Sequence, residues 1–93
     1  MVVGLVQIEL RIPGADNLKA KRMVLRSVKD RIRKNFNVSV AEVGDNDLWQ
    51  SAVLAVATVS NDRRFANQVL SKVVDLIESS RDLVVEDYQL GFY

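Results

Sequence analysis

The fold is decided by residues 6–36, which read VQIELRIPGADNLKAKRMVLRSVKDRIRKNF. Over residues 6–12 apolar and polar side chains alternate, which is the period of a half-buried strand. A Pro-Gly turn follows, and the side chain of Asp16 or Asn17 can accept a hydrogen bond from the first amides of a helix. Over residues 18–36 apolar residues recur every three or four positions, which predicts an amphipathic helix.

The rest of the chain continues the alternation of strands and helices. Residues 36–43 and 48–59 are β-prone and flank turn residues at 44–47, which predicts a hairpin. Capping residues then introduce a second amphipathic helix over 62–79, and the β-prone residues 83–92 form a last strand. The order βαββαβ predicts a ferredoxin-like α+β fold, a four-stranded antiparallel sheet with two helices on one face.

Length and composition restrict the classes of function. A chain of 93 residues, 48% of them hydrophobic, suits a single domain, residues 1–93, around one packed core. The absence of His and Cys removes thiolate and imidazole metal ligands and the usual Ser-His and Cys-His catalytic pairs. We therefore expect a binding protein rather than an enzyme, with no cofactor, no metal and no small-molecule substrate.

The sequence also bears on location. The first ten residues lack the basic segment of a secretory signal. The longest uncharged run, residues 48–61, has fourteen residues, whereas a membrane-spanning helix needs about 20 apolar ones. A cytoplasmic protein without membrane contact is expected.

Positive charge is concentrated in the first predicted helix. The net charge is +1, yet residues 1–34 carry nine Lys and Arg against three acids, and residues 35–93 carry four against nine. At 100° per residue, five of the helix cations fall within about 80° of the helix surface, directly beside the apolar face. These five residues, called the basic stripe below, are Lys19, Arg22, Arg26, Lys29 and Arg33.

The position of the basic stripe suggests a polyanionic partner. Cations in the first turn of a helix oppose its dipole, at a cost of roughly 0.3 to 1 kcal/mol per charge, and such broken local rules often mark functional sites. Phosphates docked on the helix amides and on the stripe would relieve the mismatch. We therefore predict contacts with structured RNA, for example a ribosomal subunit. A merely solvated helix face explains the same charges equally well.

Lys21 differs from the stripe because it falls inside the apolar sector of the helix. In the predicted topology Glu42, Asp45 and Asp47 lie near the start of this helix. We therefore expect Lys21 to form an internal ion pair with these acids, which could also neutralise Arg22.

The third predicted strand suggests an alternative function. Both alternating sets of residues 51–59 are apolar, so the sheet face without helices would show Val and Ala. Such a face is typical of contact with another protein or a second copy of the chain. Val53, Ala55 and Ala57 are the interface candidates of this alternative, a protein-interaction or homodimerisation module.

Trp49, the only Trp, lies at the start of this strand. Packing in the core or at the hairpin edge is expected for it in preference to stacking on a nucleic-acid base.

Four segments together carry a family resemblance: LKAKR at 18–22, FNVSVAEV at 36–43, DLW at 47–49 and SND at 60–62. In this order and spacing the chain resembles the YlxP-like family of small bacterial proteins over nearly its full length. The resemblance implies a ferredoxin-like fold and transfers no catalytic residues. The family's genes often neighbour those of a transcription elongation factor, a translation initiation factor and a ribosome-binding factor, which implies a place in translation or ribosome maturation. The family commonly has Glu where this chain has Ala20, so no role for an acid there is implied.

Overall fold

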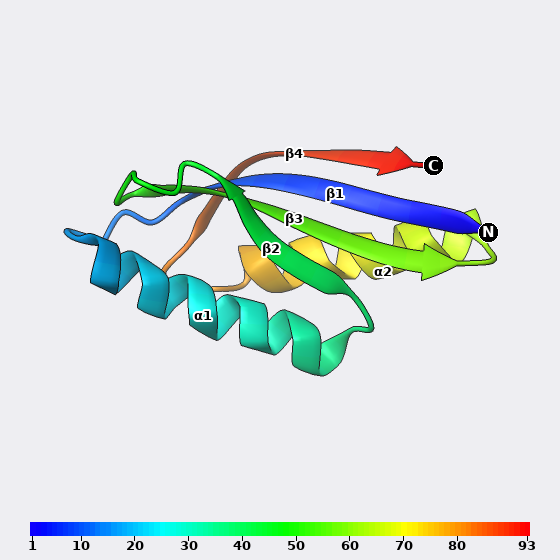
Figure 1. Ribbon diagram of the computed structural model, residues 1–93. Helices are drawn as coiled ribbons and strands as arrows, with labels where there is room; N and C mark the ends of the chain where they lie inside the picture. The colour runs from blue at the N-terminus through cyan, green and yellow to red at the C-terminus, as the bar shows by residue number, and fades with distance from the viewer.

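The computed structural model describes residues 1–93 and has the predicted βαββαβ order. The elements are β1 (Val2–Arg11), α1 (Leu18–Asn35), β2 (Ser39–Gly44), β3 (Ser51–Ser60), α2 (Arg63–Glu78) and β4 (Val84–Phe92). The four strands form one antiparallel sheet in the order β2-β3-β1-β4. Figure 1 shows both helices on the same face of this sheet, so the predicted fold class is confirmed.

Both helices begin where a polar side chain caps them. Asn17 Oδ1 accepts a hydrogen bond from the Ala20 amide at 2.8 Å, so Asn17 rather than Asp16 is the cap of α1. Asp62 Oδ1 accepts from the Arg64 amide at 2.9 Å and caps α2 in the same way. Each capped amide is one of the helix-terminal donors that has no partner within the helix.

The strand boundaries differ from the prediction at two places. β1 begins at Val2, four residues earlier than the alternation indicates, because residues 2–5 pair with β3 without alternating in polarity. β2 and β3 begin at Ser39 and Ser51, three residues later than predicted. Phe36 ends α1 as its C-cap, with its amide bonded to the Ile32 carbonyl, and so lies outside β2.

The core fills the space between the sheet and the two helices. It is formed by apolar side chains from one face of the sheet and the inner stripe of each helix, among them Val6, Ile8, Leu10, Leu25, Ile32, Leu54, Leu70 and Ile77. Gly4 lets α2 lie close to β1, since a Cβ there would meet Leu70 Cδ1 at 3.0 Å. No helix of the structure is long and apolar enough to cross a membrane.

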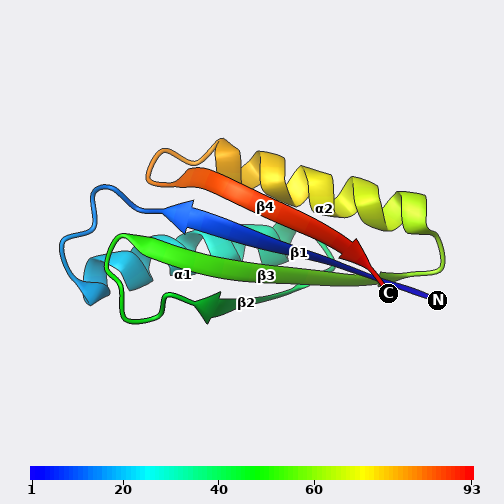
Figure 2. The same cartoon turned by 90° about the horizontal axis from the view of Figure 1, so that it is seen from above.

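The two ends of the sheet have different neighbours. The β2–β3 hairpin tip and the start of α1 lie at one end, and the two chain termini lie at the other (Figures 1 and 2). At the first end the Ile12 amide donates to the Gln50 carbonyl at 2.8 Å. At the second, Val3 and Tyr93 exchange two backbone hydrogen bonds of 2.9 Å each.

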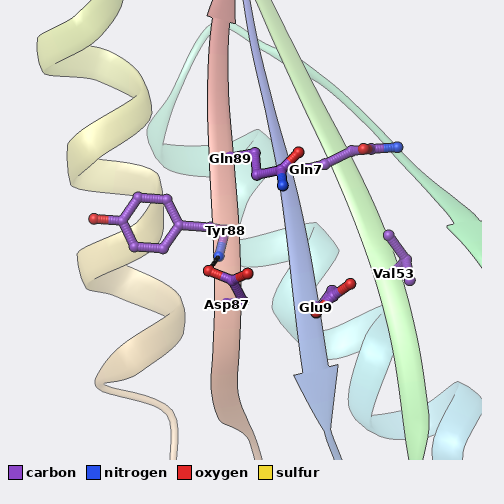
Figure 3. A pocket seen from close by; sticks show the side chains of 6 residues that line it. All are labelled: Gln7, Glu9, Val53, Asp87, Tyr88 and Gln89. Carbon is purple, nitrogen blue, oxygen red and sulfur yellow. Dashed lines mark hydrogen bonds between the residues drawn. The ribbon is translucent and has the colours of Figure 1, made fainter.

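The sheet face opposite the helices is open and carries an unfavourable charge pair. Glu9 on β1 and Asp87 on β4 are directly opposite each other, next to a register shift between Glu9 and Leu10. Both carboxylates face a shallow hollow that Gln7 and Gln89 also line, whereas the Tyr88 ring extends from β4 toward α2 (Figure 3). Like charges directly opposite on neighbouring strands destabilise a sheet.

Neutralising one member of this pair should therefore stabilise the isolated protein. We expect Glu9→Gln to raise the free energy of unfolding in urea by about 0.2 to 1 kcal/mol. The matched control is Glu86→Gln, because Glu86 has no partner residue on β1 in the register. Equal effects of the two substitutions would show that the Glu9–Asp87 repulsion is negligible.

Candidate functional site

The basic stripe lies on the flank of α1 that faces β2. Arg33 Nη2 donates to the Val40 carbonyl on β2 at 3.2 Å, whereas Arg31, on the opposite flank, donates to Ser80 Oγ after α2. A groove runs between α1 and β2. Its lining includes four of the five stripe residues, Arg22, Arg26, Lys29 and Arg33, together with Leu25, Asp30 and Glu42.

Most of the stripe has no intramolecular counter-charge. Lys19, Arg22, Arg26 and Lys29 form no ion pair within 4.0 Å, and all but the half-buried Lys29 are exposed. Arg33 approaches Asp30 at 3.8 Å, with both side chains more than half exposed, and such surface pairs contribute little. The first turn of α1 contains no acid. Lys19 and Arg22 at the start of α1 are therefore not neutralised by the hairpin, and the pairing considered for Arg22 is absent.

Lys21 is turned inward and is only 1% exposed. Its Nζ forms an ion pair with Glu42 Oε2 at 3.1 Å. It also donates to the backbone carbonyls of Asp45 at 2.6 Å and Leu48 at 2.7 Å. Two donors of the ammonium group thus have carbonyl acceptors, and the Glu42 carboxylate supplies the counter-charge, although its Oε2 accepts no hydrogen bond. One side chain of α1 thereby holds both β2 and the hairpin turn.

The expectation that Asp45 and Asp47 pair with Lys21 through their carboxylates is wrong. Asp45 contacts Lys21 only through its main-chain oxygen, and Asp47 forms no ion pair with it. A single buried carboxylate already balances a single ammonium, and burying further carboxylates would cost desolvation without gain. Neutral carbonyls complete the site, and the two aspartate residues remain exposed.

Trp49 is not in the core but in the turn of the β2–β3 hairpin, so of the two positions expected for it the core is wrong and the hairpin edge is confirmed. It is 53% exposed and absent from the hydrophobic cluster. Its neighbours explain the position: Leu48 is held by Lys21, and Gln50 Nε2 turns back to donate to the Ala15 carbonyl at 3.0 Å. Because Val43 and Leu48 are also exposed, the hairpin presents apolar side chains at the end of the sheet where α1 begins. The apolar run at residues 48–59 gives no signal that Trp49 stays outside the core.

The interface candidates lie on the open sheet face as placed by the sequence. Val53, Ala55 and Ala57 are half-buried there, opposite Glu9, Gln7 and Leu5 of β1 respectively. Polar β1 residues therefore interrupt the apolar surface of β3.

The structure brings together guanidinium and ammonium groups along the groove between α1 and β2. No group of three or more His, Cys, Asp or Glu residues is placed to hold a metal ion. The groove instead offers guanidinium and ammonium groups in a row, which are the usual partners of phosphate oxygens.

Comparisons with known proteins give a family and a fold. The family described as "Protein of unknown function (DUF503)" matches residues 3–90. The chain is 36% identical over 78 residues to the "Uncharacterized protein YlxP" of Bacillus subtilis (strain 168). The matched residues cover 84% of this chain and 85% of that protein.

Two designed proteins have a similar structure. One is the de novo designed protein LFR1 1 with ferredoxin fold, solved in solution by NMR, with a TM-score of 0.58, 12% identity and coverage of 100% of this chain and 84% of that one. The other is the de novo designed protein Foldit4, with a TM-score of 0.55, 11% identity and coverage of 98% and 96%. At these identities the likeness concerns the fold alone.

The Lys21 contacts predict a large stability effect from one side chain. We expect Lys21→Met to lower the free energy of unfolding in urea by about 3 kcal/mol, because the Glu42 carboxylate is left without its counter-charge. Adding Glu42→Leu should recover part of this loss, since it removes the unpaired charge. Lys19→Met, two residues away and exposed, is the control and should stay within about 0.5 kcal/mol of the wild type. A loss in Lys21→Met no larger than in this control would contradict the role of the buried ammonium.

Proposed function

Since the chain belongs to the DUF503 family, proteins of unknown function that include YlxP of Bacillus subtilis, we propose a function from the surface of the chain itself. The protein is, in this proposal, a non-enzymatic RNA-binding protein whose basic stripe contacts the phosphate backbone of the RNA. The observation that supports this proposal is the row of cations without intramolecular counter-charge along the groove between α1 and β2.

The dimensions of the stripe suit consecutive phosphates of one strand. Arg22, Arg26, Lys29 and Arg33 follow the groove, and at 1.5 Å per residue the distance from Arg22 to Arg33 is about 16 Å. At the start of α1, Asn17 caps only the Ala20 amide through its side chain. The preceding amides of Leu18 and Lys19 have no partner within the helix and point in the direction that favours anions.

The remaining charges would restrict how RNA approaches. The net charge is only +1, so non-specific attraction is weak at a distance. The acids lie mainly elsewhere, with Glu78, Asp82 and Glu86 after or near α2 and β4. Repulsion from these acids orients a polyanion toward the α1–β2 flank. A structured RNA, such as a ribosomal one, fits the place in translation that the family resemblance implies.

Reversing two central charges should abolish RNA binding. We expect Arg22→Glu/Arg26→Glu to lose measurable binding to a labelled RNA hairpin in fluorescence anisotropy. The affinity of the wild type for RNA should fall as the salt concentration rises. In a plot of the logarithm of the binding constant against the logarithm of the salt concentration, each neutralised phosphate contributes about −0.7 to −0.9 to the slope. Four to five engaged cations therefore predict a slope of about −3 to −4.5.

The matched control is Arg64→Glu/Lys72→Glu, which changes the net charge equally at exposed positions of α2. It should retain most of the affinity. Unchanged RNA binding in Arg22→Glu/Arg26→Glu, or equal losses in the two double variants, would refute the contact through the basic stripe.

The open sheet face supports a second candidate function, homodimerisation. The face carries apolar residues of β3 beside the opposed carboxylates of Glu9 and Asp87. Arg11 lies two residues after Glu9 and so on the same face. A second copy related by a two-fold axis could therefore pair its Arg11 with Glu9 while covering Val53.

This candidate is tested by the mass in solution. Light scattering should report a dimer for the wild type, and Val53→Asp should give a monomer because it places a charge in the covered surface. A monomeric wild type at high protein concentration would remove homodimerisation from consideration and leave the RNA proposal untouched.

A further inference from the structure

We infer that Trp49 stacks on an unpaired base of the bound RNA, so that the ligand is a duplex carrying a single-stranded extension. This inference rests on the proposed RNA contact of the basic stripe and names the kind of RNA. It follows from three features of the structure: the exposure of the indole, the anchored backbone that carries it, and the place of its hairpin at the end of the molecule where α1 begins.

The indole of Trp49 is exposed although the chain contains few aromatic side chains that could fill the core. Trp49 is the only Trp, and about half of its surface faces solvent while smaller apolar residues fill the core. Val43 and Leu48 beside it in the hairpin are also exposed. Such an exposed flat aromatic surface offers a base the stacking contact that sequence-tolerant single-strand binding uses, although the exposed Asp45 and Asp47 belong to the same turn.

The backbone that carries Trp49 is anchored on both sides. The preceding carbonyl, that of Leu48, accepts from Lys21 Nζ at 2.7 Å. The following residue, Gln50, accepts from the Ile12 amide at 2.8 Å and donates through its side chain to the Ala15 carbonyl at 3.0 Å. A stacking residue that is held in place before binding loses little conformational freedom when the base arrives.

The groove leads from the stripe to this hairpin. Arg33 contacts Val40 at the beginning of β2, and Lys21 contacts Glu42 further along it, so α1 runs antiparallel to β2. The Arg22 end of the stripe is therefore the end next to the hairpin, as the two overall views also show for the start of α1 (Figures 1 and 2). A strand whose phosphates follow the stripe toward Arg22 therefore approaches the end of the molecule that holds the hairpin with Trp49.

The combination of groups indicates an unpaired base rather than a paired one. In an RNA duplex the base faces are covered by their neighbours, and the deep major groove excludes side chains. An indole can therefore stack only at the end of a duplex or on a base that has left it, and an unpaired base beside the contacted strand can turn onto the indole. The stripe thus holds the backbone, and Trp49 selects RNA with unpaired nucleotides next to the contacted strand.

Three RNA probes separate base stacking from phosphate contact. The first is a blunt RNA duplex of two strands, which has no loop, the second is the same duplex with a four-nucleotide single-stranded extension, and the third carries an abasic extension with the same phosphates. We expect the extension with bases to bind about 5- to 150-fold more tightly than the abasic one. Since Trp49 is the only Trp, the intrinsic fluorescence of the protein reports on this residue. It should be quenched by the extension that carries bases and not by the abasic extension.

Variants assign this preference to the indole. Trp49→Ala should bind the three RNAs with the affinity that wild type has for the abasic probe, and Trp49→Phe should retain part of the preference. The matched control is Phe65→Ala on α2, which removes another exposed aromatic side chain and should change none of the three affinities. Far-ultraviolet circular dichroism and urea unfolding identify any variant that is no longer folded.

The outcomes distinguish the inferred role of Trp49 from the proposed RNA-binding function on which it rests. Binding that depends on Arg22 and Arg26 but is equal for base-bearing and abasic extensions overturns the role of Trp49 and leaves the RNA-binding function standing. Absence of binding to all three probes overturns both. Quenching by an apolar peptide and by none of the RNAs would identify the hairpin as a protein contact and would also overturn the inference.

Discussion

The buried ammonium group of Lys21 is the contact on which the arrangement of this molecule depends. Its Nζ joins α1 to Glu42 on β2 and to the carbonyls of Asp45 and Leu48 in the hairpin. These contacts set the separation of α1 from β2 and hence the groove beside the basic stripe. They also commit the Glu42 carboxylate, which lines that groove, to the inside. Glu42 is thereby paired with Lys21 and not with the stripe, whose one intramolecular acid contact is that of Arg33 with Asp30.

The same helix therefore uses its positive charges in two ways, and the 100° turn between consecutive residues separates them. Lys21 enters the apolar sector and is satisfied within the protein, whereas Arg22 falls on the exposed flank and is not. Deleting one residue of α1 before Lys21 would turn Arg22 into the buried position. Burying a cation costs more than exposing one, so the Lys21 contacts determine which flank carries the stripe.

Sequence patterns were sufficient to predict the elements whose signals lie within a few residues. They were insufficient where the conformation of a residue depends on contacts with residues that are distant in the sequence. The start of α1 and the inward direction of Lys21 follow from capping and helical period, both readable within a few residues. The first residues of β1 lack polar alternation and are strand only because β3 pairs with them. Likewise, the exposure of Trp49 depends on Lys21 and Gln50 anchoring its neighbours, which periodicity does not encode. The use of Asp45 through its carbonyl, rather than its carboxylate, depends on the turn geometry, where its φ is 59°.

The pairing of the two chain ends has a mechanical consequence. Val3 and Tyr93 are joined by backbone hydrogen bonds, and β4 runs antiparallel to β1 from that point. A force that pulls the two chain ends apart would load the hydrogen bonds between β1 and β4 one after another. β4 would therefore separate from β1 sequentially, and the bonds along the strand would not be sheared simultaneously. Rupture would thus start at the pole farthest from the hairpin. The α1–β2 groove would be the last region to feel the tension.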